Sequence, residues 1–181
     1  YIEQWKPDLA LRLSALARNG GDVQQSGVSL GSNGDFSFVR SLHSQAQSVA
    51  NKAVELLAAQ QVPAGEYVVV LDPILAGVFV HEAFGHLSEA DHIYENQQLR
   101  QIMRLGKKFS GRHLNVVDGA SVPGLRGSYE FDDEGTPSSR TYLIQEGELV
   151  GRLHSRETAA IMNEKPTGNA RSISLGFPPI V

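Results

Sequence analysis

The chain has 181 residues, of which 41% are hydrophobic and 20% are charged, so it can bury a core and is not a disordered tail. Its 16 Lys and Arg against 20 Asp and Glu give a net charge of −4, which argues against nucleic-acid binding. No apolar run reaches about 18 residues, so no membrane-spanning segment is present. The absence of Cys excludes disulfides and thiolate metal ligands within the chain.

The first third of the chain predicts a hairpin, a helix and a strand. Apolar residues alternate over 9–16, a turn signal follows at 19–22, and a second extended run covers 23–30. Residues 44–61 show helical spacing with several Ala residues, and a Pro-Ala-Gly sequence ends that helix. The continuous apolar run 67–71 favours a strand buried on both faces.

Helices dominate the next forty residues, and strands follow them. Asp72-Pro73 combines a helix-capping side chain with a residue suited to the first helical turn, which predicts a helix over 74–91. An amphipathic pattern predicts another over 93–107. After Gly111 the patterns are typical of strands, and a short helix is expected over 156–163.

These elements predict an α+β fold. We expect residues 1–110 to be the end of a mixed α/β N-terminal domain, and 111–181 to begin an antiparallel β-rich C-terminal domain. The chain starts at Tyr1 rather than Met and shows no signal-like start. We therefore expect a fragment of a larger protein, in which a site completed by other segments looks incomplete.

The sequence His81-Glu82-Ala83-Phe84-Gly85-His86 is the sharpest chemical feature. Neutral imidazoles bind Zn²⁺, and an adjacent carboxylate can take a proton from water on the metal, which indicates a zinc hydrolase. In the common zinc-protease helix the two His are four residues apart, about 40° from one another around the axis. Here the separation is five residues, which places the rings about 140° apart on a regular helix.

Two irregularities can bring these rings together. A π-turn, with about 4.4 residues per turn, reduces the angle to roughly 50°. Alternatively, the helix can end near Gly85, because glycine tolerates unusual backbone conformations. A metal site here therefore predicts an irregular helix at Phe84-Gly85. The competing interpretation is an incidental pair of His residues flanking a Glu.

Other polar residues are weaker candidates. Glu89 and Asp91 lie one turn beyond His86 and could orient the His rings, or simply form a solvated turn. The acidic turn 132–137 could bind a cation, but an ordinary exposed loop is more common. The remaining histidines have no comparable partners and are interpreted as surface or packing residues: His43, His92, His113 and His154.

Four sequence blocks resemble the TldD/PmbA family of zinc peptidases and follow in the family's order. They are His81–Asp91 (HEAFGHLSEAD), Val116–Gly119 (VVDG), Asp132–Pro137 (DDEGTP), and Lys165–Asn169 (KPTGN) with Arg171. The likeness covers most of residues 67–176. Any one block is a poor signal, whereas chance rarely produces all four in order.

The resemblance implies a function and a set of site residues. It implies that His81 and His86 are zinc ligands and that Glu82 is the catalytic residue, as in the TldD-like branch that carries HExxxH. It further implies a cytoplasmic peptidase for unfolded or precursor peptides, which bind by adding to a sheet edge. The expected assembly is a homodimer or a heterodimer with a PmbA/TldE-like subunit.

The chain departs from the family at the third zinc ligand, which is a Cys nearer the C-terminus in the family. Because catalytic zinc normally has three protein ligands, we expect weak or no zinc binding and no activity in this fragment. The family has also been described as a modulator of DNA gyrase, but the charge of −4 does not support DNA contact.

Two alternatives to a peptidase remain open. One is a non-catalytic peptide-binding or scaffolding module of the same fold. The other is a nucleic-acid binder, which requires a local basic surface. Its candidate residues more simply form a solvated helix face: Arg100, Arg104, Lys107, Lys108 and Arg112.

Overall fold

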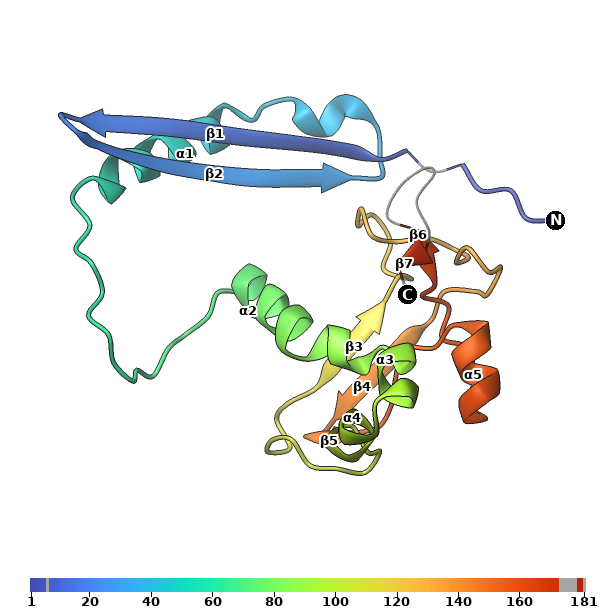
Figure 1. Ribbon diagram of the computed structural model, residues 1–181. Coiled ribbons are helices and arrows are strands. Elements are labelled where there is room, and N and C mark those ends of the chain that lie inside the picture. The colour runs from blue at the N-terminus through green and yellow to red at the C-terminus, as the bar shows by residue number, and fades with distance from the viewer. Residues whose placement is uncertain (6, 173–178, 181) are drawn as a thin grey trace. The chain divides into compact units, whose positions relative to one another are not determined.

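The computed structural model describes the chain except for residues 6, 173–178 and 181 (Figure 1). Packing divides the chain into two compact units. One unit comprises Trp5–Val69 and Gly124–Arg126, and the other comprises Tyr1–Gln4, Val70–Pro123 and Gly127–Val181. No helix among the described residues has both the length and the apolar character needed to cross a bilayer. The predicted domain boundary between residues 110 and 111 stays a prediction.

The predicted N-terminal hairpin is confirmed. β1 (Leu9–Asn19) pairs antiparallel with β2 (Asp22–Ser32), and Asn19 lies opposite Asp22 beside the turn. Gly20 in that turn has φ = +58°, a conformation that glycine adopts without steric cost. Exposure alternates along β1, so one face of the hairpin is the more covered, as the period of two predicts.

The helix after the hairpin also forms. α1 (His43–Leu56) follows a short 3-10 turn, η1 (Phe36–Val39), and lies along the hairpin in Figure 1. Val49 and Ala53 are its buried residues, four positions apart on one face. The helix ends at Leu56, five residues before the predicted end.

The strand predicted at residues 67–71 is wrong. Val68 is 104% exposed and Val70 is 98% exposed, and the segment has no regular secondary structure. A strand needs a neighbour to satisfy its backbone groups and layers to cover its faces. Among the described residues, no strand pairs with this segment. The segment is therefore apolar in composition but lacks, among the described residues, a neighbouring strand with which it could pair.

The predicted helix over 74–91 is a series of shorter helical segments. α2 (Pro73–Val80) begins at the predicted cap, where Asp72 Oδ1 accepts hydrogen bonds of 2.9 Å from the amides of Ile74 and Leu75. It continues directly into η2 (His81–Gly85), which is π-helical, and η3 (His86–Ser88), which is 3-10.

Two short helices replace the predicted helix over 93–107. They are α3 (Ala90–Glu95) and α4 (Gln97–Ile102). Asn96 separates them with an extended backbone, and its side chain accepts hydrogen bonds from the amides of Gln98 and Leu99. The amphipathic pattern therefore identified the helical region but not its interruption.

The remainder of this unit is mainly antiparallel. β3 (Val116–Gly119), β4 (Arg140–Gln145) and β5 (Glu148–Leu149) form a three-stranded sheet. α5 (Arg156–Met162) follows it and confirms the predicted short helix. The strands β6 (Arg171–Ser172) and β7 (Pro179–Ile180) pair with each other. The predicted α+β class is confirmed.

Two clusters of buried apolar side chains form the core of this unit. One contains Val116, Leu143, Ile144 and Leu153, and the other contains Ile93, Met103 and Leu149. Phe84, in the π-helical segment, packs against both clusters. The irregular segment that carries the two His is therefore anchored in the core by its own aromatic residue.

Candidate metal centre

The π-helical turn η2 brings the two imidazoles of the HExxxH sequence together. The amide of His86 donates a hydrogen bond to the carbonyl oxygen of His81, five residues earlier, which is the π-helical pattern. The two ring centroids are 4.4 Å apart, with 64° between the ring planes. This confirms the predicted irregularity and selects the π-turn over a helix end at Gly85, whose φ of −54° and ψ of −56° are helical.

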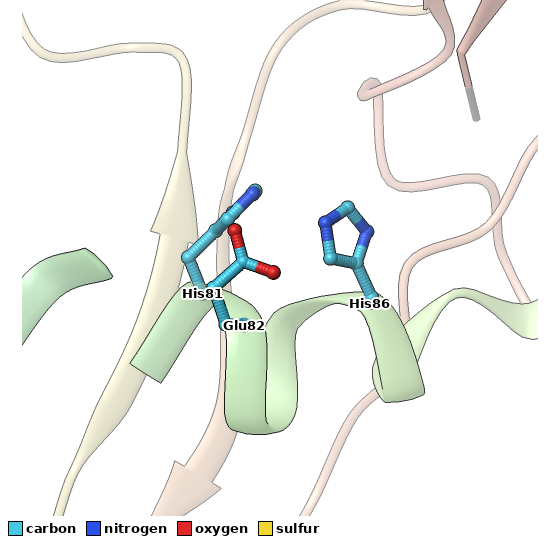
Figure 2. Close-up of side chains that lie close together, drawn as sticks. All are labelled: His81, Glu82 and His86. Carbon is cyan, nitrogen blue, oxygen red and sulfur yellow. The ribbon is translucent and has the colours of Figure 1, made fainter. Parts of the chain in front are cut away.

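Glu82 lies on the same side of the helix as the two rings. Figure 2 shows its carboxylate in the space between His81 and His86. One potential ligand atom from each of these three residues lies within 4.8 Å of the other two. All three residues are exposed. The sequence thus folds into a group of two nitrogen donors and one carboxylate that is open to a ligand.

Of the two interpretations left open for Glu89, the structure shows the contact with His86. Glu89 Oε1 lies 2.9 Å from His86 Nδ1, and its Oε2 lies 3.3 Å from His92 Nε2. The buried Oδ1 of Asp91 has no hydrogen-bond partner among the described residues. Glu89, Asp91 and His92 form a second group of potential ligand atoms within 4.8 Å.

A residue of the sheet to which the sequence analysis gave no individual role, Asp118, interacts electrostatically with His81. Asp118 is at the end of β3, and burial raises the pKa of its carboxyl, while the charge of His81 opposes that rise. Asp118 in turn contributes to the raised pKa of Tyr129, after burial. In the sequence, Asp118 stands out only as the carboxylate of the VVDG block, after two apolar residues of the same strand.

Comparisons with known proteins identify the family. Residues 64–181 match the family model described as the PmbA/TldA metallopeptidase C-terminal domain. The chain belongs to the TldD/PmbA family. It is 51% identical over 180 residues to a metalloprotease of Synechocystis, covering 99% of this chain and 39% of the relative. It is 38% identical over 166 residues to a metalloprotease of Methanocaldococcus jannaschii, covering 92% and 37%.

Solved structures share the TldD/PmbA fold at low sequence identity. A modulator of a DNA gyrase from Thermotoga maritima matches with a TM-score of 0.70 and 20% identity, over 94% of this chain and 38% of that one. TldE from Thermococcus kodakarensis matches with a TM-score of 0.64 and 17% identity, over 96% and 39%. The chain thus spans less than half of the relatives and structures that it matches.

Two further TldD/PmbA sequence blocks have structural roles. In the acidic turn, buried Asp132 accepts hydrogen bonds from the amides of Glu134, Thr136 and Ala170, so its oxygens hold the loop. In the second block, Gly168 has φ = +69° and lies against Pro137 of the first block. The interpretation of the acidic turn as a loop agrees with these bonds, although Asp132 is buried rather than exposed.

Three residues of the candidate basic surface are engaged within the chain. The Arg100 guanidinium donates to the carbonyl oxygens of Ile93 and Tyr94. Arg112 forms an ion pair with Glu146, with a nitrogen-to-oxygen distance of 2.8 Å. Lys107 Nζ lies 5.4 Å from the centre of the Phe109 ring. These contacts support the interpretation of a solvated face.

Proposed function

We propose that this chain carries the metal-binding part of a zinc-dependent peptidase. His81 and His86 are the zinc ligands in this proposal, and Glu82 is the catalytic carboxylate. The convergence of both imidazoles beside Glu82, at 4.4 Å between ring centroids, is the observation that carries it. A relative 38% identical over 112 residues is named a zinc metalloprotease TldD homolog, from Saccharolobus solfataricus.

The residues present fit zinc by the chemistry of their donors. Imidazole nitrogens and a carboxylate oxygen are ligands that zinc accepts, and the group is exposed enough for a substrate to reach it. Catalytic zinc normally has three protein ligands. Since the chain contains no Cys, the third ligand implied by the family resemblance must come from outside this chain. We therefore expect weak zinc binding and no hydrolysis by the chain alone.

Each of the three residues has its own role in peptide hydrolysis: the two His bind the metal, and Glu82 transfers the proton. When bound, zinc supplies Lewis acidity, which polarises a carbonyl and lowers the pKa of water. His81 and His86, at the two ends of the π-turn, would hold the zinc ion. Glu82 accepts the proton of the attacking water and then donates it to the amine nitrogen that leaves as the peptide bond breaks.

The substrate and the assembly are part of the proposal. The substrate class is an unfolded or precursor peptide, bound in extended form along a sheet edge through main-chain hydrogen bonds. The full-length protein is expected to form a dimer with a second copy or with a TldE-like subunit, in the cytoplasm. One of the similar structures is itself named TldE, which supports a partner of that kind.

The test compares substitutions within the HExxxH sequence of the full-length protein. Glu82→Ala should abolish peptide hydrolysis and leave zinc content unchanged, whereas His81→Ala should lose both. Full hydrolysis by the Glu82→Ala protein would contradict the assigned role. Absence of zinc from the unsubstituted protein would instead favour the non-catalytic peptide-binding module.

A further inference from the structure

Glu89 is placed to control how His86 presents its ring. We propose that Glu89 is a positioning residue that fixes the tautomer and the orientation of His86, so that Nε2 is the atom available to a metal. This inference rests on the proposed function, because it concerns the same centre. It adds a residue that contacts neither the metal nor the substrate.

The hydrogen bond between these side chains determines the tautomer. Glu89 Oε1 lies 2.9 Å from His86 Nδ1. An ionised carboxylate can only accept, so Nδ1 must carry the proton and donate it. In a neutral imidazole, Nε2 then keeps its lone pair, which is the form that binds metal. Figure 2 agrees, since one His86 ring nitrogen points toward His81 and Glu82 and the other points away.

Burial and backbone contacts make Glu89 a fixed support rather than a mobile surface residue. Its side chain is 12% exposed, against 47% for the side chain of His86. The amide of Leu153 donates to the carbonyl oxygen of Ser88 at 2.8 Å, and the amide of Ala90 donates to the carbonyl oxygen of Leu153 at 2.9 Å. Both chain neighbours of Glu89 are therefore held by the same residue of another segment.

The second carboxylate oxygen of Glu89 is also engaged. Oε2 lies 3.3 Å from Nε2 of His92, whose side chain is 59% exposed. Two imidazoles thus share one carboxylate, and each contacts a different oxygen. The contact with His92 limits rotation of the carboxylate about its own bond, which keeps Oε1 directed at His86. An alanine at position 89 would remove this acceptor and leave the His86 ring free to change its tautomer.

The first measurement is the tautomer of His86 in the metal-free chain, read from the nitrogen chemical shifts of its ring. The unsubstituted chain should show the proton on Nδ1. Glu89→Ala should shift the proton toward Nε2. Glu95→Gln, which changes an exposed carboxylate six residues later, should leave the tautomer unchanged. Because unfolding would also release the His86 ring from Glu89, the comparison uses only variants whose amide spectra show a retained fold.

The second measurement is zinc affinity in the full-length protein, by competition with a chelator. Glu89→Ala should weaken zinc binding by about 10- to 100-fold, the range found for partners of metal-bound His residues. Glu89→Gln should have a smaller effect, because its amide oxygen can still accept from Nδ1 but carries no charge. The amide spectrum of each variant shows whether the fold is retained.

The outcomes separate this inference from the proposed function. If His81→Ala and His86→Ala abolish zinc binding but Glu89→Ala does not weaken it, Glu89 has no positioning role and the metal centre stands. If neither His substitution affects zinc binding, the proposed metal centre itself is overturned. A proton on Nε2 of His86 in the unsubstituted chain would also overturn the inference.

Discussion

The hydroxyl of Ser88 donates a hydrogen bond of 2.9 Å to the carbonyl oxygen of Phe84. Ser88 is fully buried, so this bond gives its hydroxyl the partner that a buried polar group needs. The Phe84 ring packs against both core clusters, and the Phe109 ring meets it edge-on at 5.3 Å. The π-turn is therefore held by a side chain in the core and by a hydroxyl on its backbone.

Replacing Phe84 should affect both stability and metal binding. Phe84→Ala should lower the free energy of unfolding by about 3 kcal/mol, since it leaves a cavity between two clusters. Zinc binding should weaken as well, because the turn between His81 and His86 loses its anchor. Urea denaturation and chelator competition measure the two effects. Phe109→Ala is the control, and a loss of zinc affinity equal to that of Phe84→Ala would contradict this explanation.

Gly85→Ala should be tolerated. Gly85 has a helical backbone, and an added Cβ would lie 3.6 Å from His81 Nδ1, which is ordinary van der Waals contact. Alanine should therefore raise the free energy of unfolding by about 0.5–1 kcal/mol through its helix propensity. Gly77→Ala in α2 is the matched control, because a Cβ there meets nothing within 4 Å. Stabilisation by the control but destabilisation at residue 85 would contradict the π-helical geometry.

Gly168→Ala should be among the most destabilising glycine substitutions. Its φ is +69°, and an added Cβ would lie 2.1 Å from the carbonyl oxygen of Pro137. The backbone must shift, at a cost of about 3 kcal/mol in the free energy of unfolding. Gly106→Ala provides a control with φ = +83° and a nearest contact of 3.7 Å, so it isolates the backbone strain. Equal losses in denaturation experiments would show that the contact with Pro137 contributes nothing.

Tyr129 should make stability fall at high pH. Burial, followed by the charge of Asp118, raises the pKa of Tyr129 from 10.0 to about 12, although Arg171 acts against the rise. Between these values the unfolded chain releases the phenol proton and the folded chain keeps it. The free energy of unfolding therefore decreases as pH rises through this window.

Tyr129→Phe should remove that part of the pH dependence. The substitution also removes the hydrogen bond from the Tyr129 hydroxyl to the Gly168 carbonyl oxygen, which should cost about 1 kcal/mol below pH 10. Urea midpoints of both proteins are compared below pH 10 and at about pH 11. Their difference should shrink at the higher pH. An unchanged difference would show that Tyr129 titrates normally.

The parts of the fold that the sequence predicted depend on local signals. The hairpin follows from a turn of Asn and Gly between alternating residues, and α2 follows from Asp72 before Pro73. The irregular helix was predicted because a five-residue spacing on a regular helix is incompatible with a shared ligand. In each case a steric rule or a hydrogen bond acts within a few residues.

The missed features depend on residues that are distant in sequence. The apolar run 67–71 resembles a strand, but strand formation requires a partner that composition does not reveal. The role of Phe84 in bridging two clusters, and the approach of Asp118 to His81, depend on how the sheet packs against the helices. A contact of Glu89 with His86 could be raised as one of two alternatives because the two residues lie within one turn, where helical spacing still applies.

The π-turn lets two His residues five positions apart lie on the same side of the helix, as a spacing of four does on a regular α-helix. A turn that is wider by about one residue lets five positions cover nearly the rotation that four cover in an α-helix. A chain lacking Ala83 would carry His-Glu-x-x-His on a regular helix, with the same two rings still facing each other. The two spacings are thus alternative solutions to one geometric requirement, separated by a single insertion.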